Sequence, residues 1–291
     1  MRKLAPPIFN LSDLYKKCTS SISSDEARIR LESIFEILLK NEILYGERAS
    51  LFQLYLFRDA SAVGSVNKDE LSRLYSQTFV RKNGPTRDIY DFLRKSPGNI
   101  CPLCCQRTVS TLDHYLPKAR HPAFAVTPIN LVPSCKDCNI DSQQKQSFYA
   151  GDQTLHPYFD DVDGEIWLVA DAVDGGAPAI QFRTQEVSIW GATKNEMIAS
   201  HFKTYGLASL YSDHAGPELV NIYIDLEDAG LLQDAFSISE HLANEARRRR
   251  RAFKNSWQSA LYGGLAESVW FCSEGVHDIK KSELFPGARS P

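Results

Sequence analysis

The sequence has no long apolar run, no apolar stretch behind its first basic residues and no strong excess of one charge. No stretch approaches the roughly 20 apolar residues that cross a bilayer, and no apolar segment follows the N-terminal charges of Arg2 and Lys3. The chain carries 33 Lys and Arg against 36 Asp and Glu, a net charge of −3. This balance excludes a polybasic protein held to nucleic acid by bulk charge, although a local basic face is compatible with it. We expect a cytoplasmic protein without membrane insertion.

The composition also excludes a disordered chain and a small fold that depends on disulfides. Hydrophobic residues make up 43% of the 291 residues and charged residues 24%, which is ordinary globular usage. A chain of this length forms about two domains with cores of their own. Its seven cysteines therefore point to bound metal in an intracellular protein. The isolated Cys18 and Cys272 are expected to be buried apolar residues.

Hydrophobic periodicity predicts an α+β protein that is mostly helical and has three domains. In residues 1–96 apolar residues recur at helical spacing, and a break at 96–99 follows. In residues 97–165 repeated prolines leave little room for long helices, so bound metal is expected to order the segment. Residues 166–291 should form a C-terminal domain with a short β-hairpin and helices. The expected helices lie near 24–39, 51–56, 71–75, 88–93, 196–205, 218–232 and 239–270, and the expected strands at 165–170 and 179–183.

Two Cys-x-x-Cys pairs in the middle segment predict a structural zinc site. Cys101 pairs with Cys104, and Cys135 with Cys138; each pair can place two thiolates about 2.3 Å from the metal, on one side of a tetrahedron. The 30 residues between the pairs exceed the roughly 15–20 of a compact four-cysteine ribbon, so another element is inserted there. Cys105 adds a third thiol near the first pair, but only Cys104 has the two-residue spacing from Cys101.

The inserted segment carries a second motif. Leu-Asp-His-Tyr-Leu-Pro-Lys spans 112–118, Asn-Leu follows at 130–131, and Asn139 comes directly after the last cysteine. This pattern resembles the HNH nuclease motif of the ββα-metal fold, whose ends are clamped by zinc knuckles in many members. Together with His-Pro-Tyr-Phe-Asp at 156–160, the motif sequence resembles a bacterial branch of this family found in anti-phage systems, such as the HNH nuclease components of Septu-type or Zorya-type systems. The resemblance is strong over about 60 residues and weak in the flanks.

The residue types in this motif suit phosphodiester hydrolysis, which needs an activated water and neutralisation of developing negative charge. Asp113 offers the carboxylate that a hard divalent ion prefers. His114, adjacent on an extended strand, points to the opposite face and is free to act as a general base with a pKa near the working pH, provided that a carbonyl group holds its far nitrogen. The resemblance places Asn130 and Asn139 among the catalytic residues. In that reading Asn130 braces the loop beside the histidine strand, and Asn139 supplies the second ligand to the catalytic ion.

Three positions depart from the family pattern or lie beyond it. Members that end in histidine often carry another histidine one turn later, where this chain has Gln143, a poor ligand. The catalytic site is therefore expected to take Mg²⁺ or Mn²⁺ rather than zinc. Cys105 occupies a place usually filled by a small residue such as glycine. His156 is either a further metal ligand or a capping or packing residue of a His-Pro turn.

Basic residues beside the motif are candidates for contacts with nucleic acid. Lys118, Arg120, Lys136 and Lys145 would contact phosphates, which position a strand without reading its sequence; solvated surface charge is the alternative. The arginine run 247–251 would ring a helix rather than form one face, because consecutive residues diverge by about 100°. We expect that helix to be solvated or to face a partner.

These observations predict a metal-dependent HNH endonuclease that nicks or cuts DNA, with structural zinc and catalytic Mg²⁺ or Mn²⁺. The resemblance further implies an effector of a bacterial anti-phage defence system with a protein partner, such as an ATPase or a membrane motor complex; a homodimer is a further expectation. Two alternatives stay open. The first is a non-catalytic zinc module that binds nucleic acid or protein, which has no need for a carboxylate–histidine pair. The second is an RNase on the same scaffold.

Overall fold

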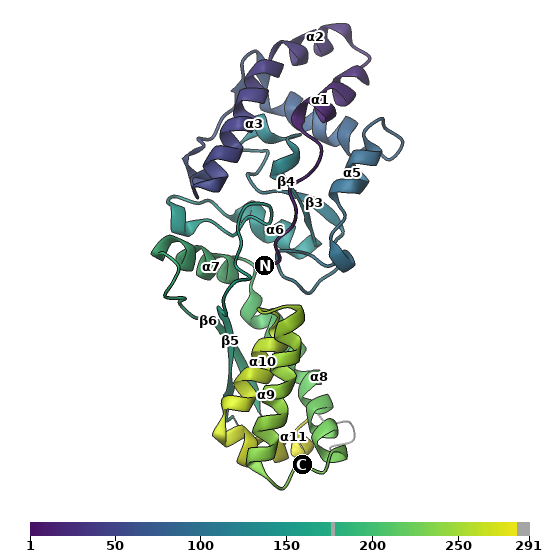
Figure 1. Ribbon diagram of the computed structural model, residues 1–291. Coiled ribbons are helices and arrows are strands. Elements are labelled where there is room, and N and C mark those ends of the chain that lie inside the picture. Colours follow the sequence, from purple (N-terminus) through teal and green to yellow (C-terminus); the bar gives the residue numbers. More distant parts are fainter. Residues whose placement is uncertain (176–177, 284–291) are drawn as a thin grey trace. The chain divides into compact units, whose positions relative to one another are not determined.

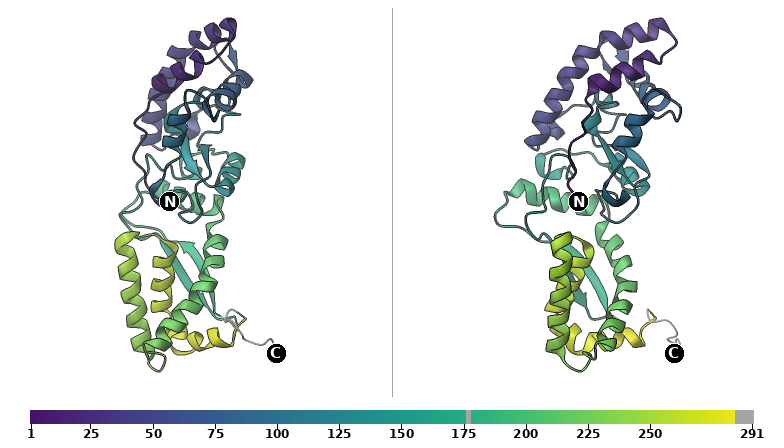
Figure 2. Two further views of the ribbon diagram at one scale, coloured as in Figure 1. Left: turned by 90° about the vertical axis from the view of Figure 1, so that its right-hand side faces the viewer. Right: turned by 45° about the vertical axis from the view of Figure 1, so that its right-hand side comes forward.

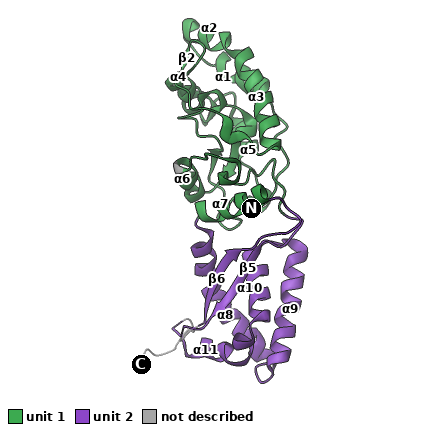
Figure 3. Cartoon of the chain, turned by 90° about the vertical axis from the view of Figure 1, so that its left-hand side faces the viewer, with its two compact units in different colours: residues 1–162, 192–205 green, residues 163–191, 206–291 purple. Residues whose placement is uncertain are grey.

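The computed structural model describes residues 1–175 and 178–283. The chain folds into two compact units, the first made of residues 1–162 and 192–205 and the second of residues 163–191 and 206–291 (Figure 3). The boundary expected between residues 165 and 166 lies close to the observed change at residue 163. Residues 192–205, expected in the C-terminal domain, belong instead to the first unit.

The boundary expected between residues 96 and 97 falls inside the first unit, because the parts on either side share one hydrophobic core. Leu14, Leu38 and Phe79 of the N-terminal part belong to the same buried cluster as Leu112 and Leu131 of the following segment. Burying such a side chain contributes about 1.5–3 kcal/mol, so the shared cluster stabilises both parts together. The N-terminal helices are therefore part of the scaffold that holds the motif segment.

The helices of the N-terminal part begin where the sequence supplies capping side chains. Asn10 and Ser24 accept hydrogen bonds from backbone N–H groups at the starts of α1 (Leu11–Ser20) and α2 (Asp25–Ser33). The single helix expected over 24–39 is two helices, since a turn at Ile34 precedes α3 (Phe35–Ser50). The other elements are a 3₁₀ turn (Leu54–Leu56), β1 (Ala62–Val63), β2 (Val66–Asn67), α4 (Lys68–Arg73), a π-helical turn (Leu74–Phe79) and α5 (Arg87–Leu93) (Figure 1).

Two strands and a helix form the motif segment. β3 (Thr111–His114) pairs antiparallel with β4 (Leu131–Ser134), in a register that sets Asp113 opposite Val132 and His114 opposite Leu131. α6 (Lys136–Gln144) starts directly after β4, with Cys135 as its N-cap. The prolines begin short 3₁₀ turns rather than long helices, as expected. These turns are Pro97–Asn99, Pro122–Phe124 and Pro128–Asn130, and the rest of the unit contains Ala150–Asp152 and α7 (Ala192–Thr204).

The second unit is a β-hairpin packed against helices. β5 (Leu168–Val173) pairs antiparallel with β6 (Ala179–Thr184), which confirms the expected hairpin. α10 (Trp257–Glu267) packs so closely on β5 that a Cβ at Gly264 would overlap the carbonyl oxygen of Ala170. α8 (Leu207–Asp228) packs on β6 and runs through Pro217, where the sequence suggested a helix start. The unit also contains α9 (Ala235–Ala252), a π-helical turn (Phe271–Gly275) and α11 (Val276–Lys281) (Figure 2). Across the described residues, no helix combines the length and apolar character needed to cross a membrane.

The two isolated thiols are buried, as the sequence suggested. Cys18 belongs to the core of the first unit, and Cys272 is buried within the second. Burial raises the pKa of each thiol to about 11. Both groups are therefore neutral thiols at neutral pH, as expected for buried apolar residues.

Candidate functional site

The four paired cysteines meet at one point of the first unit. The sulfur atoms of Cys101, Cys104, Cys135 and Cys138 all lie within 4.8 Å of one another, and all four residues are buried. Sulfurs bound tetrahedrally at 2.3 Å are separated by about 3.8 Å, so this donor set fits a zinc ion. The cluster joins the turn before β3 to the start of α6, so a bound ion would clamp the two ends of the motif segment. It is the one such group of His, Cys, Asp and Glu side chains within the described ranges.

Cys105 lies outside this cluster, as the spacing predicted. Its backbone adopts a left-handed conformation with φ of +56°, which favours glycine because a Cβ is strained there. Its sulfur lies 3.6 Å from the carbonyl oxygen of Pro102. The preference for a small residue at this place in related motifs therefore has a backbone cause, and the thiol of Cys105 is not needed for the cluster.

Asp113 is a buried carboxylate at the end of β3. Its oxygens accept hydrogen bonds from the backbone N–H of His114 at 2.7 Å and from the hydroxyl group of Ser142 on α6. Burial raises the pKa of this carboxyl from its ordinary value to about 7. Ser142 was not predicted, but the sequence held a signal: it follows Asn139 by three residues and so lies on the same face of the helix.

His114 points away from Asp113, as the alternation of an extended strand predicted. Its Nε2 lies 2.9 Å from the carbonyl oxygen of Ala125, and the ring packs edge-on against Tyr75 with the centroids 4.4 Å apart. Because a carbonyl can only accept, Nε2 carries the proton and the lone pair resides on Nδ1. Burial lowers the pKa of this imidazole to about 3, so the expectation of a pKa near the working pH is wrong and the ring is neutral at physiological pH.

Lys118 interacts electrostatically with both Asp113 and His114. Its ammonium group lies 4.8 Å from the centroid of the Tyr75 ring, against which His114 also packs. Burial lowers the pKa of Lys118, and the nearby Asp113 carboxylate opposes that shift. The same ammonium charge helps to lower the pKa of His114. Lys118 is thus a half-buried cation next to the proposed reacting groups rather than a free surface lysine.

Asn139 lies on α6 beside the strand that carries Asp113. Its side-chain amide donates to the carbonyl oxygen of Leu112 at 3.3 Å, and its Oδ1 accepts from the Nε2 of Gln143 at 2.6 Å. Gln143, which the sequence marked as a poor metal ligand, therefore orients the amide of Asn139. The amide of Asn139 therefore contacts the backbone of β3 one residue before Asp113, and Asn139 is not among the residues that line the cavity beside the Asp113 carboxylate.

Asn130 is fully buried and braces the loop that follows β3. Its Oδ1 accepts from the backbone N–H of Leu116 at 2.7 Å and from the hydroxyl of Tyr45 at 3.0 Å. Its amide donates to the carbonyl oxygens of Leu116 and Phe124, each at 3.1 Å. Every polar atom of this side chain is used within the protein, so Asn130 holds the loop and does not reach a reacting group.

His156 lies in a buried aromatic cluster rather than beside Asp113. Its Nε2 is 3.1 Å from the hydroxyl of Tyr45, its Nδ1 accepts from the backbone N–H of Tyr158, and its ring packs against Tyr115 at 4.3 Å. Both ring nitrogens are therefore engaged. The suggested role as a further metal ligand does not fit this arrangement, and the alternative, a packing residue of the His-Pro turn, does.

The remaining cationic side chains differ in their exposure and in their ion-pair partners. Lys136 is exposed at the start of α6, whereas the ammonium of Lys145 forms an ion pair with Asp152 at 2.6 Å. The guanidinium of Arg120 donates to the backbone carbonyl of Lys145. In the arginine run, Arg248 and Arg249 pair with Glu245 on their own helix. Part of the positive charge of the run is therefore neutralised by Glu245, which is consistent with a helix surface in contact with solvent.

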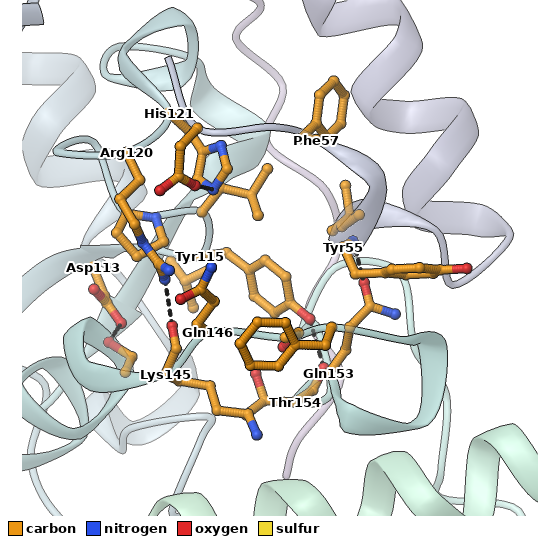
Figure 4. Close-up of a pocket in the computed structure, with 18 of the residues that line it drawn as sticks. Tyr55, Phe57, Asp113, Tyr115, Arg120, His121, Lys145, Gln146, Gln153 and Thr154 are labelled. Atoms are coloured by element: carbon orange, nitrogen blue, oxygen red, sulfur yellow. Dashed lines mark hydrogen bonds and ion pairs between the residues drawn. The ribbon is translucent and has the colours of Figure 1, made fainter. Parts of the chain in front are cut away.

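A cavity of about 430 Å³ opens beside the carboxylate of Asp113. Figure 4 shows Asp113, Arg120 and Lys145 on one side of it and Tyr55 and Gln153 on the other. His114 is not among the residues that line it. Asp113, Arg120 and Lys145 were candidates from the sequence. Sequence analysis missed Tyr55, Gln153 and other lining residues, because they lie outside the motif.

Comparison with known proteins gives one informative match. Protein ea31 of Escherichia phage lambda is 33% identical to this chain over 235 residues, which cover 76% of this chain and 79% of the relative. No protein-family model matches the chain, and no solved structure matches it.

Proposed function

We propose that this chain, which belongs to the family of protein ea31 of Escherichia phage lambda, is a metal-dependent endonuclease of the HNH type that hydrolyses phosphodiester bonds in DNA. One observation carries the proposal. The end of β3 offers a buried carboxylate and a neutral imidazole on adjacent residues, Asp113 and His114, and each is held by a contact from another element. A module that only binds has no use for this pair.

The oxygen donors of the site suit a hard divalent ion. The carboxylate of Asp113 and the amide oxygen of Asn139 would hold Mg²⁺ or Mn²⁺. When bound, such an ion would neutralise the charge that develops on the phosphate. The four cysteine sulfurs would hold a zinc ion that keeps β3 and α6 in place. The two proposed sites thus differ chemically. Soft sulfur ligands would hold the structural zinc, and hard oxygen ligands would hold the catalytic ion.

His114 would act as the general base, although its ring lies outside the cavity that Asp113 lines and its pKa of about 3 makes it a weak base in the absence of substrate. Its Nδ1 lone pair takes a proton from water while the water oxygen forms a bond to phosphorus, and the bond from phosphorus to the leaving oxygen breaks. The leaving oxygen then takes a proton from solvent. The carbonyl of Ala125 stabilises the protonated ring through the Nε2–H bond. Lys118 lies near enough to both groups to attract the phosphate toward them.

A cleavage assay tests the proposal. Supercoiled plasmid, single-stranded DNA and RNA are incubated with the purified protein and Mg²⁺ or Mn²⁺, with His114→Ala as the inactive variant. Nicked or linear plasmid with the wild type alone supports a DNA endonuclease, and cleavage of RNA alone supports the RNase alternative. Intact nucleic acid under every condition, together with measurable binding, supports the non-catalytic zinc module.

We further propose that the protein acts as the effector of an anti-phage defence system, with an ATPase or membrane motor complex as its partner. This proposal rests on the resemblance of the motif segment to HNH components of such systems. Co-purification of the tagged chain from its host tests it. A partner with a nucleotide-binding fold supports the proposal, whereas a protein that purifies alone and cleaves without a partner contradicts it.

A further inference from the structure

The cavity beside Asp113 is larger than the reacting groups require. Its volume of about 430 Å³ lies within the roughly 300–1,000 Å³ of ligand pockets. Asp113 and Ser142 occupy one end, and the cavity continues past Tyr115 to Tyr55 (Figure 4). A metal ion held by Asp113 needs only that end. The remaining space has room for part of the substrate.

Aromatic side chains supply much of the wall. Tyr55, Phe57, Tyr115, Tyr205 and Phe148 line the cavity. Phe148 follows the end of α6 by four residues and is 73% exposed, so its ring is accessible to a bound ligand. Flat faces of this kind stack with nucleobases of any sequence. The cavity therefore offers a stacking surface at its entrance.

Polar groups in the cavity fall into two sets. The amide of Gln153 is used within the wall, since it accepts from the backbone N–H of Tyr55 and donates to the carbonyl oxygens of Phe52 and Ala150. Gln146 is exposed, and Figure 4 shows it beside Tyr115. A free amide offers one donor and one acceptor side by side, which matches the edge of a nucleobase.

The charges around the entrance suit a phosphate chain. Arg58, Arg120 and Lys145 line the cavity, and Asp59 and Asp113 are the acidic groups there. Asp59 faces His121 at 3.9 Å, and Lys145 is paired with Asp152 at 2.6 Å. Arg58 and Arg120 therefore supply most of the positive charge that lines the cavity. Their guanidinium groups can attract the phosphates on either side of a bound base.

We propose that this cavity receives one nucleobase of the substrate strand next to the scissile phosphate, with the base stacked against Phe148 and contacted by the amide of Gln146. The inference rests on the nuclease function proposed above and specifies its substrate. A base inside an intact duplex cannot enter the cavity without leaving the stack. The favoured substrate is therefore a single strand or a duplex with an unpaired base.

Binding measurements without Mg²⁺ or Mn²⁺ test the inference. Fluorescence anisotropy is recorded for a short labelled DNA strand, for its full duplex, and for a duplex with one unpaired base. We expect the single strand and the unpaired-base duplex to bind more tightly than the full duplex. Phe148→Ala should weaken these two interactions roughly ten-fold, and Gln146→Ala should weaken them less. Phe236→Ala is the matched control, because Phe236 is 75% exposed but lies on α9 of the second unit.

The outcomes separate this inference from the nuclease proposal. If Phe148→Ala and Gln146→Ala bind like the wild type, or if the full duplex binds as tightly as the single strand, the base pocket is wrong even when plasmid cleavage depends on His114. If both variants lose single-strand binding but no metal supports cleavage, the pocket stands and the nuclease proposal fails. Melting curves confirm that the variants are folded.

Discussion

The hydroxyl group of Ser142 donates a hydrogen bond to the carboxylate of Asp113 and so ties the last turn of α6 to the end of β3. The four-cysteine cluster connects the other end of α6 to the turn before the same strand. The strand and helix that carry Asp113 and Asn139 are therefore fixed at two places. A site fixed in this way would need little rearrangement in the reaction proposed above.

Replacing Asp113 with asparagine should abolish metal-dependent cleavage and also stabilise the protein when no Mg²⁺ is added. Burial raises the pKa of this carboxyl to about 7, whereas the unfolded chain has a pKa near the ordinary 3.8. Between about pH 4 and pH 7 the unfolded state loses a proton that the folded state retains, so the wild type loses stability as pH rises. Asparagine avoids this loss, which amounts to about 2–4 kcal/mol. Urea unfolding of the wild type and Asp113→Asn at pH 5 and pH 8 measures this loss. If the free energies of unfolding of the two proteins differ by the same amount at both pH values, the burial argument is contradicted.

His114→Ala should lower cleavage by roughly 10²- to 10⁴-fold. Because the ring is buried against Tyr75 and Ala125, the substitution should also leave a cavity and cost about 1–3 kcal/mol of stability. Added imidazole should restore part of the activity by occupying that cavity. His241→Ala, on α9, is the control and should cleave like the wild type. Rescue that fails in a folded variant argues against a proton-transfer role.

Cys135→Ser should reduce bound zinc and lower the melting temperature, since structural zinc contributes directly to folding. Cys105→Gly should retain zinc, because Cys105 lies outside the sulfur cluster. It should also be neutral or stabilising by up to about 1 kcal/mol, because glycine adopts the left-handed backbone at this position without strain. Elemental analysis and thermal melting of the two variants measure both effects. Equal zinc content in Cys135→Ser and wild type would refute the cluster.

Asn130→Ala should destabilise the protein by roughly 3–5 kcal/mol, because it leaves the backbone groups of Leu116 and the carbonyl of Phe124 buried without partners. Tyr45→Phe removes one of the four hydrogen bonds of Asn130 and should cost about 1–2 kcal/mol. Denaturant unfolding of both variants gives the comparison. A smaller loss in Asn130→Ala than in Tyr45→Phe would mean that the loop is held by other contacts.

Lys136→Ala should weaken binding to DNA. The slope of the logarithm of the binding constant against the logarithm of the salt concentration should fall by about one, which corresponds to one lost phosphate contact. Lys136 is exposed at the start of α6. Lys145→Ala should have a smaller effect, because its ammonium is already paired with Asp152. Titrations at several salt concentrations give the slopes. A larger effect of Lys145→Ala than of Lys136→Ala would show that the ion pair between Lys145 and Asp152 opens when DNA binds.

Several features of the fold follow from local sequence alone. The N-cap Ser24, the β-hairpin of the second unit and the scarcity of long helices between residues 97 and 165 all depend on residue types and short spacings. The four-sulfur cluster was predictable for the same reason, since each pair is set by a two-residue spacing. Local rules could not show that the N-terminal helices share a core with β3 and β4, because that packing joins residues far apart in the chain.

The sequence by itself determined the residue types at the end of β3 and the placement of Asp113 and His114 on opposite faces, because successive side chains alternate along an extended strand. Only the tertiary structure decided which groups hold them. Ala125 orients the imidazole, Ser142 contacts the carboxylate, and His156 is enclosed by tyrosines away from the site. Hydrogen bonds and burial between distant segments set these contacts, and no spacing along the chain encodes them.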